Sequence, residues 1–108
     1  MPQIMIRGME LNDIKRISKP LVDELSEVIG CPRDYFTIEQ IHSTFIADGE
    51  ITKAYPFIQV NWFDRGQEIQ DKAAKVIDSY VRDAGYEQVE VYFIVLNEEK
   101  YYENGEHY

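Results

Sequence analysis

Arg65 is the basic residue best placed in this sequence to hold an anion. It follows a strand predicted at residues 57–63 and precedes a predicted helix. The free N–H groups and the dipole at the start of a helix favour a negative ligand. We therefore interpret Arg65 as a candidate partner for the carboxylate of a small acid, with a solvated loop arginine as the alternative.

Few other residues have the type and spacing that nucleophilic or metal chemistry requires. The chain has one cysteine, Cys31, and two histidines, His42 and His107. The histidines lie far apart, without the neighbours typical of a catalytic triad or a zinc site, so we expect no metal and no cofactor. Cys31 is expected to be a small buried side chain. Glu39 is a candidate second acid or base, with a solvated strand position as the commoner role.

Length and charge limit the class of protein to which these residues belong. The chain has 108 residues, 44% of them hydrophobic, and a formal net charge of −9. This size and apolar content predict a single folded domain over residues 1–108. The negative charge and the scattered basic residues disfavour nucleic-acid binding. No apolar run approaches the ~20 residues of a membrane span and no signal peptide is recognisable, so we expect a cytoplasmic protein without membrane contact.

The first elements that must position these residues are a strand and a helix. Residues 3–9 alternate in the manner of a short strand. From Asn12 or Asp13 as the N-cap, apolar residues recur at three- and four-residue spacing until Gly30, which predicts one helix. Pro20 lies inside this helix, and we expect it to cause a kink rather than a break.

Two further strands are predicted in the middle of the chain. Residues 35–47 are rich in β-branched and aromatic side chains, and their alternation slips near residues 40–41 in the manner of a bulge. Asp48 and Gly49 then predict a turn. Residues 57–63 form the next predicted strand.

The last third of the chain predicts a second helix, a long strand and a small hairpin. Asp64 is expected to be the N-cap of the helix, with Gln67 as its capping-box partner, and Gly85 ends the helical pattern. Residues 89–95 alternate as a strand. Residues 104–105, Asn-Gly, predict a C-terminal hairpin.

The two halves of the chain are similar to each other. The pattern Pro-x-Ile-x-Ile at residues 2–6 corresponds to Pro-x-Ile-x-Val at residues 56–60. A duplicated β-α-β unit predicts an α+β fold, in which a four-stranded mixed sheet carries two helices on one face. Ferredoxin-like ligand-binding modules and the tautomerase superfamily both have such a duplicated unit.

The other face of the predicted sheet has no cover within one chain. A face of this apolar character in a small protein is usually buried by a partner chain, so we expect an oligomer. Its expected residues are Met5, Arg7, Glu90, Tyr92, Ile94 and Leu96.

Several segments together carry a resemblance to one of these two groups. Pro2 directly follows the initiator Met at the head of the first strand, and residues 29–36 lead from the first helix into the second strand. Residues 43–50 form a loop with an aromatic residue, Phe45. The patterns Tyr-Pro-x-x-x-Val-x-Trp-Phe-x-Arg at residues 55–65 and Tyr-Tyr-Glu-Asn-Gly-Glu-His-Tyr at residues 101–108 follow.

Together these segments resemble the tautomerase superfamily, which includes 4-oxalocrotonate tautomerase and macrophage migration inhibitory factor. The most specific likeness is to an uncharacterised bacterial branch, a domain of unknown function. The likeness covers essentially the whole chain.

This resemblance implies a catalytic role for Pro2. In the family the initiator Met is removed, and the terminal prolyl amine acts as a general base. Such an amine titrates near the α-amino reference of ~8, and an apolar wall lowers its pKa. The neutral amine then moves a proton at the carbon next to a carbonyl. Retention of Pro2 as an ordinary strand residue is the alternative.

The resemblance also implies a homotrimer, with a pocket around Pro2 that is built from two subunits and binds a small carbonyl or carboxylate compound. Phe45 would lie near the proline, and Glu90 and Tyr92 match pocket positions of the cytokine branch. An exposed strand face is an equally good interpretation of Glu90 and Tyr92. For Phe45, a core position is commoner than a pocket wall.

The sequence departs from the well-studied branches where specificity is decided. Asn12 and Thr37 replace the two arginines of the oxalocrotonate branch, and Cys31 replaces a lysine of the cytokine branch. The substrates of those branches are therefore not carried over. A non-enzymatic oligomeric scaffold or small-ligand-binding module of the same fold remains the alternative function.

Overall fold

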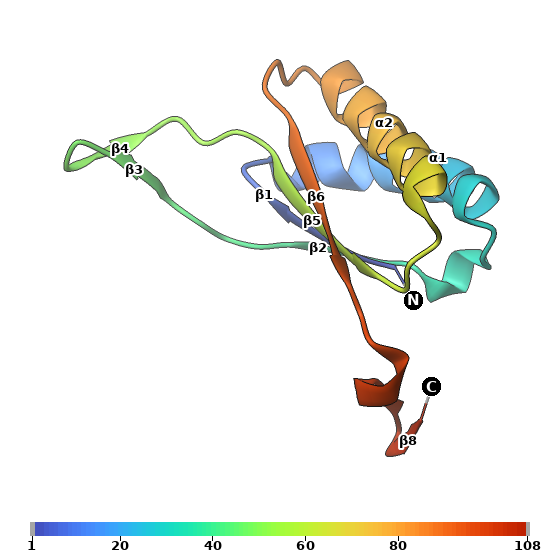
Figure 1. Cartoon of the computed structure of the whole chain (residues 1–108). Coiled ribbons are helices and arrows are strands. Elements are labelled where there is room, and N and C mark those ends of the chain that lie inside the picture. The colour runs from blue at the N-terminus through green and yellow to red at the C-terminus, as the bar shows by residue number, and fades with distance from the viewer. Residues whose placement is uncertain (1, 108) are drawn as a thin grey trace.

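The structure is a computed structural model of the chain and describes residues 2–107. The main elements form two β-α-β units with a hairpin between them and another after them (Figure 1). In chain order they are β1 (Gln3–Arg7), α1 (Leu11–Ile29), the 3-10 helix η1 (Arg33–Tyr35), β2 (Thr37–Gln40), β3 (Phe45–Ala47), β4 (Glu50–Thr52), β5 (Phe57–Trp62), α2 (Gln67–Asp83), β6 (Glu90–Val95), the 3-10 helix η2 (Glu98–Lys100), β7 (Tyr102–Glu103) and β8 (Glu106–His107).

The central sheet has the strand order β2-β1-β5-β6. β1 is parallel to β2, β5 is parallel to β6, and the two central strands β1 and β5 are antiparallel. Both helices lie on one face of this sheet (Figure 1). The predicted α+β fold with a duplicated β-α-β unit and a mixed four-stranded sheet is therefore confirmed.

The core lies between the sheet and the two helices. Alternate residues of β1 and β5 point towards the helices and are at most 1% exposed, as are Leu21 and Leu25 of α1 and Ile77 of α2. The strand residues in this set are Ile4, Ile6, Ile58, Val60 and Trp62. The two central strands therefore supply the fully buried residues of the sheet, and residues of the outer strands pack around them.

The start of α1 differs from the prediction. The helix begins at Leu11 with Glu10 as N-cap, not at Asn12 or Asp13, and continues without interruption through Pro20. The Tyr86 hydroxyl accepts a hydrogen bond from the Glu10 N–H (3.0 Å) and donates one to the Asp13 carboxylate (2.6 Å). A side chain more than 70 residues away completes this end of the helix, so local spacing alone predicted the wrong cap.

The expected capping box of α2 is also absent. The Asp64 carboxylate accepts a hydrogen bond from the Gly66 N–H (2.8 Å), Gly66 is the N-cap, and the Gln67 side chain donates to Asp71. Asp64 therefore stabilises a tight turn before the helix rather than the helix itself.

The long strand predicted at residues 35–47 is two separate strands. β2 ends at Gln40, whose side chain donates to the Met9 carbonyl (3.0 Å), and the chain then leaves the sheet. β3 pairs with β4 in a hairpin closed by the predicted turn at Asp48 and Gly49. The slip in alternation marked the end of a strand and not a bulge.

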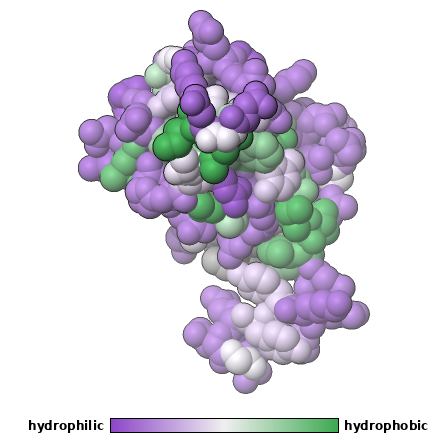
Figure 2. All heavy atoms as spheres, turned by 90° about the vertical axis from the view of Figure 1, so that its left-hand side faces the viewer, coloured by the Kyte–Doolittle hydropathy of each residue, from purple (hydrophilic) through white to green (hydrophobic). Residues whose placement is uncertain are grey.

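Two hairpins extend away from the body (Figure 1). The β3–β4 hairpin leaves from one side, and the β7–β8 hairpin, which contains the predicted Asn-Gly turn, extends from the end of β6. The molecule measures 44 × 28 × 25 Å. Viewed from the side that the β3–β4 hairpin faces, apolar atoms interrupt the hydrophilic surface in the body and just above the C-terminal hairpin (Figure 2).

Candidate active site

Pro2 lies at the head of β1 in a closely packed position. Its side chain is less than 2% exposed, and its carbonyl accepts a hydrogen bond from the Thr37 N–H (3.1 Å). Gln3 is opposite Asn61 in the antiparallel pairing, so Pro2 is next to Trp62 on the neighbouring strand. Met1, whose removal the resemblance implies, lies outside the described residues.

Trp62 supplies an apolar wall and an unused donor at this end of the sheet. The indole packs against Phe93 with ring centroids 5.0 Å apart and is 1% exposed. Its N–H has no hydrogen-bond partner within residues 2–107. A buried N–H without a partner costs about 1–3 kcal/mol, which makes Trp62 an unusual feature of an otherwise apolar core.

Arg65 lies at the same end of the molecule as Cys31. Its guanidinium donates a weak hydrogen bond to the Phe63 carbonyl (3.4 Å), just before the start of α2. Burial raises the pKa of the Cys31 thiol, and the positive charge of Arg65 opposes this shift. Cys31 is 7% exposed, as predicted, and its raised pKa disfavours the nucleophilic thiolate.

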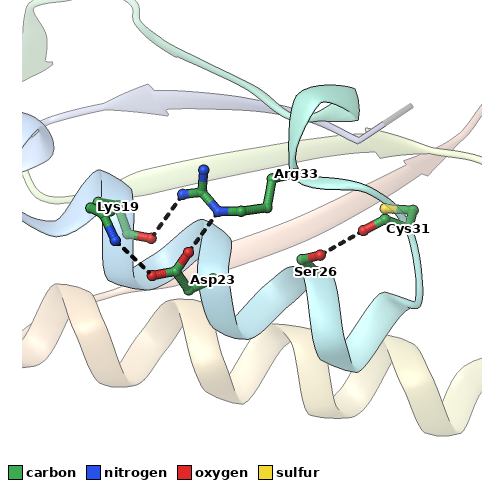
Figure 3. Close-up of polar contacts among 5 residues, drawn as sticks. All are labelled: Lys19, Asp23, Ser26, Cys31 and Arg33. Carbon is green, nitrogen blue, oxygen red and sulfur yellow. Dashed lines mark hydrogen bonds and ion pairs between the residues drawn. The ribbon is translucent and has the colours of Figure 1, made fainter.

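The loop that holds Cys31 is fixed to α1 by a small polar cluster (Figure 3). The Asp23 carboxylate accepts hydrogen bonds from Arg33 (2.6 Å) and Lys19 (3.3 Å), and the Ser26 hydroxyl donates to the Cys31 carbonyl (2.6 Å). Desolvation raises the pKa of Asp23, but the hydrogen bonds from Lys19 and Arg33 outweigh it, so the pKa lies below its usual value. These contacts set the position of the loop beside β1.

Sequence reasoning missed two aromatic residues at this end. Phe63 is 5% exposed, and its ring meets the ring of Tyr101 edge to face, with centroids 5.3 Å apart. The segment after β6 therefore packs beside the strand exit that carries Arg65. The sequence pattern of residues 101–108 predicted a hairpin and the family resemblance but not this contact, because nothing in local spacing predicts a contact over 38 positions.

The other candidate residues lie at the opposite end of the sheet. Phe45, Tyr55, Phe57 and Tyr92 form a chain of ring contacts with centroids 5.2, 6.2 and 5.5 Å apart. Together with Arg7 they line an open groove of about 490 Å³. A hydrogen bond to the Glu90 carboxylate raises the pKa of the Tyr55 hydroxyl, which places Glu90 at the same groove.

One copy of the chain does not bring these two sets of residues together. The groove is lined by Phe57 at the start of β5, whereas Asn61, near the other end of this strand, pairs with Gln3 next to Pro2. The two positions are about 13 Å apart, because a strand rises ~3.3 Å per residue. Glu39 is exposed on β2 beside Met5, and lies in neither set. Within one copy, Phe45, Glu90 and Tyr92 therefore do not lie beside Pro2.

The open face of the sheet is more polar than predicted. Tyr92 donates to Gln59, Gln59 donates to Asn61 (2.9 Å), and Asn61 donates to Gln3 (3.3 Å). The prediction considered only residues of the first and last strands and omitted those of β5, which lie between them. The middle of this face is a hydrogen-bonded row of amides, with apolar side chains at its ends.

Two further hollows lie where the loop before β5 and the segment after α2 meet, and one of them extends to residues 8–11 and 40–43 of the first repeat. They have volumes of about 510 and 600 Å³, share Lys53, Ala54 and Tyr86, and are not lined by Pro2 or Arg65. Across residues 2–107, no three His, Cys, Asp or Glu side chains are grouped as metal ligands. No helix in this part of the chain is long and apolar enough to cross a membrane.

A family model described as Domain of unknown function (DUF1904) matches residues 1–107. This chain belongs to that family. A crystal structure of a DUF1904 domain from Sebaldella termitidis shares 37% identity over the full length of both chains, with a TM-score of 0.94. No curated protein matches the sequence.

More distant structures show that the DUF1904 fold is that of the tautomerase superfamily. A macrophage migration inhibitory factor-like protein from Entamoeba histolytica is 20% identical over 99% of this chain and 98% of its own, with a TM-score of 0.64. A symmetric trimer of fused wild-type 4-OT is 18% identical over 90% of this chain and 85% of its own, with a TM-score of 0.67. The family match confirms the predicted domain-of-unknown-function branch, and these structures confirm the predicted tautomerase-type fold.

Proposed function

We propose that this DUF1904 protein is a tautomerase-like isomerase that acts on a small carbonyl acid, with Pro2 as its general base. The observation that carries this proposal is the position of Pro2. It is buried at the head of β1, beside the apolar Trp62 and at the same end of the molecule as Arg65.

The proposed reaction is a proton transfer between carbon and oxygen. After removal of Met1, the neutral Pro2 amine takes a proton from the carbon next to the substrate carbonyl, and the electrons of the C–H bond form an enolate. Return of the proton to the enolate oxygen gives the enol. Arg65 holds the substrate carboxylate, and its charge also favours the enolate.

The proposed active form is a homotrimer in the cytoplasm. The 4-OT relative of this fold is described as a trimer, and the separation of Pro2 from the aromatic groove supports a site shared between copies. In such a site, Phe45, Tyr92, Glu90 and Glu39 are proposed as substrate-binding residues from the neighbouring copy.

A ligand-binding module without catalysis is the second candidate function. It is favoured by the groove of Phe45, Tyr55, Phe57 and Tyr92, which has a guanidinium, Arg7, and lies away from Pro2. Such a groove can bind a small carboxylate without any use of the prolyl amine.

The test compares two prolines in correctly processed protein, whose intact mass shows that Met1 is absent. Pro2→Ala should lower the rate of phenylpyruvate or oxaloacetate enolisation by roughly 100-fold or more, which is the usual contribution of a general base. Pro56→Ala is the matched control, because Pro56 opens the second repeat in the same way but its nitrogen is an internal amide. Circular dichroism monitors folding. Equal rates for wild type and Pro2→Ala would favour the ligand-binding module.

A further inference from the structure

The proposed function does not use the two hollows at the Pro56 end of the sheet. They have volumes of about 510 and 600 Å³, and Lys53, Ala54 and Tyr86 line both of them. In Figure 1, the end of β1 and the starts of β5 and β6 lie at this end of the sheet, where the hollows open. Because they share three residues, the two hollows are neighbours, and we call the pair the double hollow.

Contacts between distant segments hold the walls of the double hollow in place. Gly8 lies so close to Tyr55 that an added Cβ would be 1.9 Å from the Tyr55 carbonyl oxygen. The Tyr86 hydroxyl accepts a hydrogen bond from the Glu10 N–H (3.0 Å). All four residues line the double hollow. A concave surface that is already formed binds a small molecule without the cost of ordering its walls.

The double hollow carries charged side chains of both signs. His42 and Glu10 line one hollow, Glu87 lines the other, and Lys53 lines both. Within residues 2–107, the side chains of Lys53, His42 and Glu87 form no hydrogen bond or ion pair. Ion pairs do occupy five other basic side chains, which are Arg16, Lys19, Arg33, Lys72 and Arg82. The double hollow therefore offers free partners to a ligand with charges of both signs.

We propose that the double hollow binds a small zwitterion, a molecule with one carboxylate and one ammonium group, such as a free amino acid. The carboxylate binds Lys53 and His42, whose ring N–H can donate a hydrogen bond, and the ammonium group binds Glu87. This inference goes beyond the proposed function and does not depend on the catalytic role of Pro2.

Charge favours a zwitterion over a ligand with a single charge. The field of a chain of net charge −9 repels an anion, whereas a zwitterion has no net charge. A cation is repelled by Lys53, which lines both hollows. Only a ligand with both groups pairs with Lys53 and Glu87 at once.

The double hollow binds its ligand without the chemistry proposed for Pro2. Pro56 lines it and precedes β5 as Pro2 precedes β1. The nitrogen of Pro56 belongs to an internal peptide bond, and its lone pair is delocalised into the carbonyl group. It cannot act as a general base, so this end of the sheet is a binding site only.

Three probes separate the two charges of the ligand. L-leucine has both groups, isocaproate has the same branched chain without the amine, and isoamylamine has it without the carboxylate. NMR titration of the wild-type protein follows the amide signals of residues 8–11, 40–43 and 85–88, which line the double hollow. L-leucine should bind roughly three- to tenfold more tightly than either single-charge probe, because it makes one more charge-assisted contact.

Two variants assign each charge to its partner. Lys53→Gln should weaken the binding of L-leucine and isocaproate by roughly three- to tenfold and should not weaken that of isoamylamine. Glu87→Gln should weaken the binding of L-leucine and isoamylamine by a similar factor and should not weaken that of isocaproate. Lys75→Gln and Glu98→Gln are the matched controls, because they remove the same charges at exposed positions outside both hollows. Both controls should bind all three probes as the wild type does.

Two results would overturn the zwitterion site directly. One is L-leucine that binds no more tightly than the single-charge probes, and the other is unchanged L-leucine affinity in Lys53→Gln. Arg65→Ala separates this site from the Pro2 end, because Arg65 lines neither hollow, and it should retain full L-leucine binding. Loss of that binding in Arg65→Ala would place the ligand at the Pro2 end and overturn this inference, while the proposed function would stand.

Discussion

The two ends of the central sheet have the same backbone arrangement but differ in the side chains around them. Pro2 opens the first repeat and Pro56 opens the second, and both side chains are less than 2% exposed. The Pro2 carbonyl accepts a hydrogen bond from Thr37 at 3.1 Å, and the Pro56 carbonyl accepts one from Glu90 at 3.0 Å. The duplicated unit thus repeats its hydrogen bonds as well as its elements.

The Pro56 end is joined to the rest of the chain by long-range contacts, although the aromatic groove and the two larger hollows open beside it. Tyr86 occupies the start of α1, and the backbone of Gly8 packs against that of Tyr55. At the Pro2 end the corresponding helix, α2, begins at a glycine N-cap with no side-chain cap, beside Arg65. The comparison teaches that the two ends are held differently, with a distant tyrosine at the helix start of one and Arg65 at the helix start of the other.

The largest expected effect on stability is at Gly8, which lies at the Pro56 end. Gly8 has a φ of +81°, and an added Cβ would lie 1.9 Å from the Tyr55 carbonyl oxygen. Gly8→Ala should therefore lower the free energy of unfolding by at least about 3 kcal/mol, from left-handed strain and overpacking together. Gly30→Ala is the matched control, because its φ is +79° but nothing lies within 4 Å, and it should cost only about 1 kcal/mol. Urea unfolding measures both, and equal costs would show that the close approach is not a constraint.

The next effect concerns which end binds a carboxylate. A charge-assisted hydrogen bond is worth about 1.5–3 kcal/mol, so Arg65→Ala should weaken the binding of citrate or a 2-oxo acid by roughly ten- to a hundredfold. Arg65→Lys should restore only part of it, because an ammonium lacks the planar fork of the guanidinium. Arg7→Ala, at the aromatic groove, should have the smaller effect. Calorimetric titration measures the affinity of each variant. A larger loss of affinity in Arg7→Ala than in Arg65→Ala would assign the ligand to the Pro56 end.

A smaller effect is expected from the Tyr86 hydroxyl, which binds the start of α1. Tyr86→Phe removes the hydrogen bonds to Glu10 and Asp13 and should lower the free energy of unfolding by about 1–2 kcal/mol. Tyr80→Phe removes only an exposed hydrogen bond to Glu24 and should cost less than about 0.5 kcal/mol. Thermal unfolding of the two variants compares them, and indistinguishable midpoints would mean that Tyr86 does not stabilise the start of α1.

The smallest effect is a pH dependence at the Pro2 end. The pKa of Asp23 is lower in the folded chain than its ordinary value of 3.8, because of Lys19 and Arg33. Its ion pairs therefore contribute their full stability above pH 3.8 and lose it as the pH falls through the lower, folded pKa. The difference in unfolding free energy between wild type and Asp23→Asn should shrink over that range. A difference that stays constant down to pH 2 would contradict this assignment.

The sequence was most informative where the signal is periodic and local. Alternation in β1 and β5, and the apolar stripes of α1 and α2, predicted the four-stranded sheet and the two helices, because burial of one face requires that spacing. The turns at Asp48-Gly49 and Asn104-Gly105 were also predicted from a local signal, because each turn needs residues that tolerate a positive φ.

Contacts between distant segments were the part that local patterns missed. Tyr86 at the start of α1 and Tyr101 beside Phe63 lie far from their partners in sequence, and no spacing rule connects them. The candidate site shows the same division. The sequence singled out Pro2, Arg65, Phe45 and Tyr92, but their separation along β5 became visible only in the fold.

By itself, the sequence determined the repeated β-α-β plan. Both halves have apolar residues at the same spacing, and each half must bury these side chains. Only the tertiary structure decided which contacts hold each end of the sheet and which candidate residues are neighbours. The physical reason is that strand register and crossing set these distances, and the register of the two central strands depends on pairing partners that lie 50 or more residues apart.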